Sequence, residues 1–127
     1  MELDVTNELE QKVPVSPTII KGWLTDELKE QGRDTRYYIE IIWVSETRMT
    51  ELNKKYRRMD TPTDVLSFPM ENNRIKNASN AIKPLGSIVL CLDVIAKQAS
   101  DARVALESEL EKMVRHGLRH LVGIHHN

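Results

Sequence analysis

The chain has 127 residues, of which 40% are hydrophobic and 29% charged, and its formal net charge is −1. This composition excludes collagen-like, low-complexity and wholly disordered chains, and the length predicts a single domain over residues 1–127. One cysteine, no secretory signal pattern and no apolar run near the roughly 18 residues of a membrane helix predict a cytoplasmic protein without membrane contact.

After a first strand that is given no bounds, the predicted elements are two helices separated by a second strand. Residues 16–32 begin with Ser-Pro and end near a glycine, and serine is a preferred N-cap while proline suits the first helical position. Residues 37–44, Tyr-Tyr-Ile-Glu-Ile-Ile-Trp-Val, are β-branched and aromatic and predict a buried strand. Ser45 is then expected to cap a second helix that runs toward Tyr56.

The second half of the chain predicts two strands and two further helices. Residues 63–69 indicate a short strand that ends at a proline, and the polar stretch 71–84 indicates a loop. An apolar strand is expected over 86–92, followed by a helix over 93–100 that Asp93 caps and a last helix over 105–122. The order strand–helix–strand–helix–strand–strand–helix–helix predicts an α/β (α+β) fold, in which helices cover a small mixed β-sheet.

Positive charge is concentrated in the helix predicted after the strand over residues 37–44, although the whole chain is nearly neutral. Residues 48–58 carry a local charge of +4. Their basic members are Arg48, Lys54, Lys55, Arg57 and Arg58. A charge run is usually a solvated helix end, and it indicates a binding surface only where it faces a reactive site.

The C-terminus supplies such a site, because all four histidines fall within the last twelve residues. The apolar face of the last helix comprises Leu106, Leu110, Met113, Val114, Gly117 and Leu121. His116 and His120 lie one turn apart at the margin of this face. A histidine pair spaced i, i+4 can place both imidazoles on one metal ion.

A third ligand requires the chain to turn back. In a continuous helix, position 126 would point away from His120, so we expect Gly123 to end the helix in the left-handed conformation. The chain could then bring His125 or His126 to the same ion. A histidine at a helix margin is more often simply packed or solvated, but this spacing favours a metal site. Three imidazoles favour zinc, with nickel as an alternative.

The segment His116-Gly-x-x-His120-Leu-x-Gly-x-x-His126 resembles the H-G-x-L-H-L-x-G-Y-D-H signature of the YbeY family of rRNA-maturation endoribonucleases. Residues 52–69, Leu-Asn-x-x-Tyr-Arg-x-x-Asp-x-Pro-Thr-Asp-Val-Leu-Ser-Phe-Pro, resemble a second family motif, and residues 85–88, Leu-Gly-Ser-Ile, a third. The three motifs occur in the family's order and cover most of residues 37–127.

The resemblance implies an α/β fold with a three-histidine zinc site at the end of the last helix. It also implies a single-strand-specific endoribonuclease that acts in small-subunit rRNA 3′-end maturation and ribosome quality control. One zinc per chain would be held by His116, His120 and His126, and Arg57 would be the functional arginine. The implied partners are single-stranded RNA, rRNA, the small ribosomal subunit and ribosome-associated factors.

The chain departs from the family's usual pattern at four positions. Arg119 stands in place of Leu, Ile124 in place of Tyr, and His125 and Ser87 each in place of Asp. His125 could compete with His126 as the third ligand. Family members usually continue beyond this motif, so a chain ending at Asn127 is expected to be a short or truncated form.

Other residues of the chain have favoured structural roles, and two other functions are compatible with the sequence. Asp60 and Asp64 could form a catalytic pair, but a turn and a strand-start cap are the favoured roles. Cys91 is expected to be an inert core thiol. One alternative function is a non-catalytic ribosome-associated or RNA-binding protein with a structural metal. Another is a metal-dependent hydrolase of a different phosphoester or of a peptide bond, although Gly117 stands where zinc peptidases carry their general-base glutamate.

Overall fold

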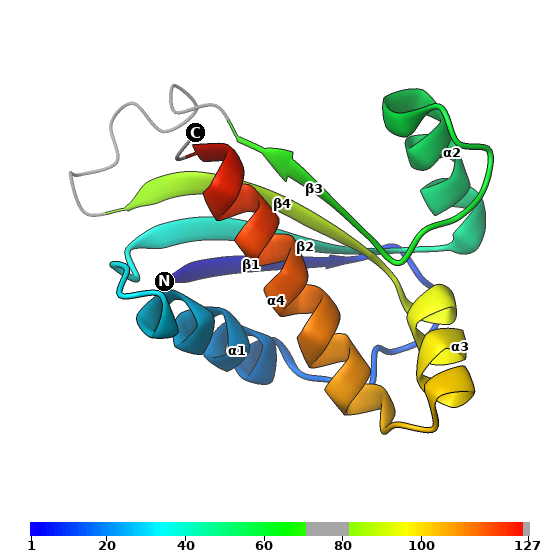
Figure 1. The fold of residues 1–127 in the computed structure, drawn as a ribbon, viewed down its shortest axis with the longest axis horizontal. Coiled ribbons are helices and arrows are strands. Elements are labelled where there is room, and N and C mark those ends of the chain that lie inside the picture. Colours follow the sequence, from blue (N-terminus) through cyan, green and yellow to red (C-terminus); the bar gives the residue numbers. More distant parts are fainter. Residues whose placement is uncertain (71–81, 126–127) are drawn as a thin grey trace.

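The computed structural model describes residues 1–70 and 82–125, which form four strands and four helices (Figure 1). The elements are β1 (Glu2–Asn7), α1 (Pro17–Glu30), β2 (Tyr37–Val44), α2 (Glu46–Arg57), β3 (Val65–Pro69), β4 (Lys83–Cys91), α3 (Leu92–Ala102) and α4 (Leu106–His125). Their order confirms the predicted one. Most of the predicted loop over 71–84 lies outside the described residues, and its last two residues belong to β4, so that boundary was wrong.

The strands form one mixed sheet in the order β1-β2-β4-β3. β1, β2 and β4 run parallel, whereas β3 pairs antiparallel with β4 at the edge. In this register Ile41 of β2 lies beside Ile88 of β4, and Ile88 lies beside Ser67 of β3. The predicted α+β fold with a small mixed sheet is therefore confirmed.

Helices cover the sheet on two faces, and each face has its own apolar core. α1 and α4 cross one face (Figure 1), where Ile41, Ile88 and Leu110 belong to the larger core. On the other face, Met49 of α2 packs in a smaller core with Leu66. Consecutive side chains of a strand point to opposite faces, so β3 contributes Val65 to the first core and Leu66 to the second. No helix within the described residues is long and apolar enough to span a membrane.

Helix starts follow the predicted capping pattern in two cases out of three. The Oγ of Ser16 accepts a hydrogen bond from the backbone N–H of Ile19 at 3.3 Å, and Ser45 caps α2 in the same way through Arg48 at 3.1 Å. α3 instead begins at Leu92 without a side-chain cap, so the predicted cap by Asp93 is wrong. Asp93 lies in the first turn, where a negative charge complements the helix dipole.

The predicted helix end at Gly123 is also wrong. α4 continues to His125, and Gly123 has no left-handed backbone. The side chains just before it, Leu121 and Val122, are 0% and 2% exposed, so packing on the core holds the last turns helical. The predicted third ligand, His126, lies outside the described residues.

Candidate active site

A cleft of about 460 Å³ opens beside the edge strand β3, between the end of α2 and the side of α4. Its lining residues are Tyr56, Arg57, Val65, Leu66, Ser67, Phe68, His116 and His120. Arg57 and the two histidines come from motifs far apart in the chain, and the fold brings them to one cavity.

The two histidines share the cleft because of the way α4 packs. Leu110, Val114 and Leu121 are fully buried, which directs one stripe of the helix into the core. His116 and His120 lie one turn apart at the exposed margin of this stripe, as predicted. Among the described residues, no group of three His, Cys, Asp or Glu side chains could hold a metal ion, so the three-histidine site stays a prediction.

Glycine allows α4 to lie close to the sheet next to His116. A Cβ on Gly117 would lie 2.7 Å from Cγ2 of Ile88. The Oγ of Ser67 in β3 donates a hydrogen bond to the carbonyl oxygen of Gly117 at 3.0 Å. Gly86 in β4 is equally confined, because a Cβ there would lie 2.4 Å from the carbonyl oxygen of Phe68. Both glycines belong to the motifs quoted above, and these close approaches explain them physically.

Arg57 is the last residue of α2, and the turn that follows it is fixed by Asn53. The side-chain amide of this buried asparagine donates to the carbonyl oxygen of Thr61 at 2.8 Å. Its backbone carbonyl accepts from the N–H of Met59 at 3.3 Å. Asn53 and Ser67 belong to the motif over residues 52–69, but no role was predicted for either, since no local pattern distinguishes a positioning amide or hydroxyl from a solvated one.

The basic residues of α2 are largely free of acidic partners. Within the described part of the chain, Arg57 makes no ion pair, nor do Lys54 and Lys55. Arg48 is the exception, because its guanidinium lies 3.3 Å from the carboxylate of Glu51. The cleft therefore has an unpaired guanidinium beside two imidazoles, a donor set suited to an anion such as phosphate.

Asp64 and Cys91 have structural surroundings, as predicted. Asp64 accepts a hydrogen bond from the N–H of Val65 at 2.7 Å, which caps the start of β3, and another from Gln98 of α3 at 3.1 Å. Cys91 is fully buried, and burial raises the pKa of its thiol, which disfavours the reactive thiolate. Asp60 lies exposed in the loop before β3.

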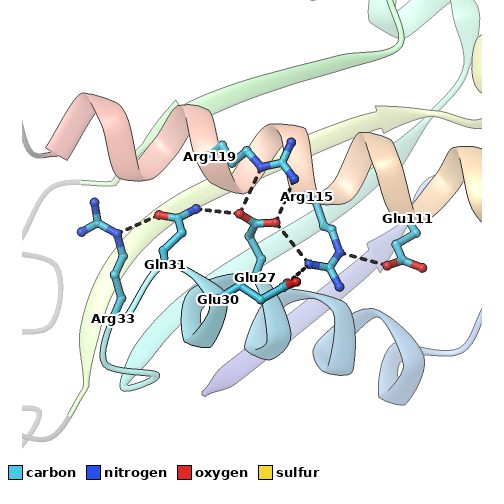
Figure 2. Close-up of polar contacts among 7 residues, drawn as sticks. All are labelled: Glu27, Glu30, Gln31, Arg33, Glu111, Arg115 and Arg119. Carbon is cyan, nitrogen blue, oxygen red and sulfur yellow. Dashed lines mark hydrogen bonds and ion pairs between the residues drawn. The ribbon is translucent and has the colours of Figure 1, made fainter.

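On its other flank, α4 is tied to α1 through a buried carboxylate (Figure 2). Glu27 is 5% exposed and accepts hydrogen bonds from Arg119 at 3.0 and 3.1 Å and from Arg115 at 3.2 Å. Gln31 donates a further bond at 2.7 Å. Burial would raise the pKa of Glu27, but the hydrogen bonds from Arg119, Gln31 and Arg115 outweigh it and lower the pKa to about 2.

This contact sets the orientation of the helix at the cleft. Arg115 and Arg119 immediately precede His116 and His120, respectively. Because both arginines bind one carboxylate, α4 is held against rotation about its axis, and the histidine stripe stays turned toward the cleft. In the sequence, Arg119 is distinguished only as a departure from the leucine of the motif that the chain resembles.

Comparison with known proteins agrees with the motifs in the cleft. The profile of the family described as Endoribonuclease YbeY matches residues 4–127. The chain belongs to this family. The Endoribonuclease YbeY of Salinispora tropica is 33% identical to it over 99% of this chain and 83% of the relative. That of Clostridioides difficile is 30% identical over 99% of this chain and 78% of the relative.

A solved structure supports the YbeY assignment at the level of the fold. The solution structure of TM1509 from Thermotoga maritima superposes with a TM-score of 0.58 at 27% identity. The match covers 94% of this chain and 71% of that protein.

Proposed function

We propose that this YbeY family member is a metal-dependent endoribonuclease that cleaves single-stranded RNA in the cleft between α2 and α4. The observation that carries the proposal is the convergence of Arg57, His116 and His120 on one cavity, beside basic side chains that make no ion pair within the described residues. Relatives named Endoribonuclease YbeY, which align with nearly the whole chain, support an RNA substrate.

Arg57 is the proposed catalytic residue. Its planar guanidinium can bind a phosphate through two parallel hydrogen bonds, and it stabilises the negative charge that grows on the phosphoryl oxygens in the transition state. The turn held by Asn53 keeps this side chain at the cleft. Because Arg57 has no acidic partner in the described residues, no ion pair must break before it binds the substrate.

His116 and His120 are the proposed metal ligands on α4, with His126 as the third. Two imidazoles one helical turn apart at the same cleft fit zinc, and nickel accepts the same donors. Bound zinc would supply Lewis acidity toward the phosphoryl group. The hydrogen bonds of Arg115 and Arg119 to Glu27, and the close packing at Gly117, hold this part of α4 beside the cleft.

The basic residues at the end of α2 are the proposed binding surface for the rest of the RNA strand. Lys54, Lys55 and Arg58 are exposed and follow one another along the end of the helix next to Arg57. Contacts of such side chains with phosphates are independent of sequence and weaken as salt rises. We propose the small-subunit rRNA 3′ end as the substrate and the small ribosomal subunit as the partner that selects it, in rRNA maturation and ribosome quality control.

Metal removal tests this proposal. The zinc content of the purified chain and its cleavage of single-stranded RNA are measured before and after chelation, with circular dichroism as the monitor of folding. The proposal predicts stoichiometric zinc and loss of cleavage on chelation while the chain remains folded. Unfolding on chelation, with no cleavage at any metal load, would instead favour a non-catalytic RNA-binding protein with a structural metal.

A further inference from the structure

A second cavity, of about 250 Å³, adjoins the cleft. Tyr56 and Phe68 line both cavities, and their rings meet edge to face with centroids 4.9 Å apart. The other lining residues are Glu8, Ile42, Val44, Arg48, Leu52, Ser87 and Val89. Tyr56 is 55% exposed, so its ring is accessible from solvent. The two cavities are thus neighbours that share the side chains of Tyr56 and Phe68.

The two cavities differ in the charged side chains that line them, and they are therefore suited to different ligands. Arg57 in the cleft has no acidic partner among the described residues, whereas Arg48 in the second cavity is paired with Glu51 at 3.3 Å. Glu8 adds a carboxylate to the second cavity. A phosphate there would meet an arginine already bound to Glu51, and the carboxylate of Glu8, which makes no ion pair within the described residues. The second cavity therefore disfavours phosphate and suits a neutral group.

The apolar and hydrogen-bonding side chains of the second cavity suit a nucleobase. Aliphatic side chains from β2, β4 and α2 and the ring of Tyr56 offer a surface for a flat aromatic group. The carboxylate of Glu8 can accept a hydrogen bond from an exocyclic amino group, and Ser87 can donate or accept. Glu8 is placed at the cavity because its backbone N–H donates to the carbonyl oxygen of Trp43 at 3.0 Å, directly after β1.

We propose that this second cavity is a nucleobase subsite, which takes the base of a nucleotide adjoining the phosphate held at Arg57. It favours bases that carry an exocyclic amino group over uracil, because that group can donate to Glu8, whereas uracil offers only its ring N3–H. The proposal rests on the proposed function in so far as single-stranded RNA is the ligand, and it adds a base preference to an otherwise sequence-independent grip.

Binding of RNA that cannot be cleaved tests the subsite separately from catalysis. The probes are fluorescent oligocytidylate and oligouridylate with 2′-O-methyl riboses, and anisotropy gives their Kd values for the full chain at fixed salt. Tyr56→Ala should raise the Kd of both oligonucleotides by about 10-fold, the scale for losing one base–aromatic stack. Tyr56→Phe keeps an aromatic ring and should retain most of the wild-type affinity. Val104→Ala, which trims another exposed apolar side chain, is the matched control.

Glu8→Gln is the more specific variant. Wild type should bind oligocytidylate more tightly than oligouridylate, and Glu8→Gln should bring the ratio of the two Kd values close to one. Glu10→Gln, at an exposed neighbour outside the cavity, should keep the wild-type ratio. If Tyr56→Ala fails to fold, this ratio alone decides the proposal.

These measurements distinguish failure of the nucleobase subsite from failure of the proposed endoribonuclease function. A preference that depends on Glu8, in a chain that cuts no RNA, supports the subsite and refutes the proposed function. Cleavage that requires Arg57, with equal wild-type Kd values for both oligonucleotides and no effect of Tyr56→Ala, would overturn the subsite. The second cavity would then have another occupant, such as a protein segment.

Discussion

Glu27→Gln tests whether the buried carboxylate holds α4 in place on α1. The substitution keeps size and one acceptor oxygen but removes the charge that Arg119 and Arg115 share. Removing one partner of a fully buried ion pair costs about 3–5 kcal/mol. The cost here should be lower, because the Arg119 side chain is 57% exposed and can return to water. Arg115 also keeps its bond to Glu111 at 2.9 Å.

The lowered pKa of Glu27 also reflects the stability that this carboxylate provides. A pKa of about 2 in the folded chain, against an ordinary value of 4.5, corresponds to roughly 3 kcal/mol of stability when the carboxylate is ionised. This stability is fully present above pH 4.5 and is lost as the pH falls toward 2. We therefore expect Glu27→Gln to lower the free energy of unfolding by about 2 kcal/mol at pH 7.

Equilibrium urea unfolding at a series of pH values measures this effect. The difference in free energy of unfolding between wild type and Glu27→Gln should narrow as the pH falls below 4.5, because the stability that ionised Glu27 provides is lost in wild type. The other carboxylates titrate in both proteins and cancel from the difference. Glu30→Gln is the matched control: Glu30 also binds Arg115 but is 65% exposed, so its loss should cost about 0.5 kcal/mol or less. Equal losses of stability in the two variants, or a difference between wild type and Glu27→Gln that is constant from pH 7 to pH 3, would show that the charge of Glu27 does not hold α4 on α1.

Further variants test the packing of α4 and the basic patch. Gly117→Ala should lower the free energy of unfolding by about 1–3 kcal/mol, because its Cβ would lie 2.7 Å from a methyl group of Ile88. Gly123→Ala should raise it by about 0.5 kcal/mol, since Gly123 is helical with open space around it, and a loss would indicate a left-handed helix end. Lys54→Ala should weaken RNA binding and reduce the slope of log K against log salt by about 0.7, as read from titrations at several salt concentrations.

Much of the fold was predictable because its signals are local. The strand over 37–44 and the caps at Ser16 and Ser45 follow from residue type and position. The wrong boundaries have a common cause, which is packing between distant segments. Gly123 carries a stop signal that buried neighbours on α4 override, and β4 begins at Lys83 because it pairs with Tyr37 of β2.

The candidate site was predictable only in part. Helical periodicity placed His116 and His120 on one face, but their meeting with Arg57 depends on how α4 lies against β3, and only the family resemblance indicated it. Glu27 gave no signal, because a glutamate in an amphipathic helix is usually solvated. Its partner Arg119 lies 92 residues away in the chain, so only the folded structure reveals the pair.

The cleft is the proposed catalytic centre, in which Arg57 acts on the scissile phosphate. The direct measurement is steady-state cleavage of a single-stranded RNA by wild type, Arg57→Ala and Lys54→Ala, with zinc content determined for each. Arg57→Ala should lower kcat by about 10²–10³-fold with zinc content unchanged, the scale for losing one donor that stabilises transition-state charge. Lys54→Ala should mainly raise KM. If Arg57→Ala also raised only KM, in a manner that depends on salt, Arg57 would be one more backbone contact and the catalytic assignment would be wrong.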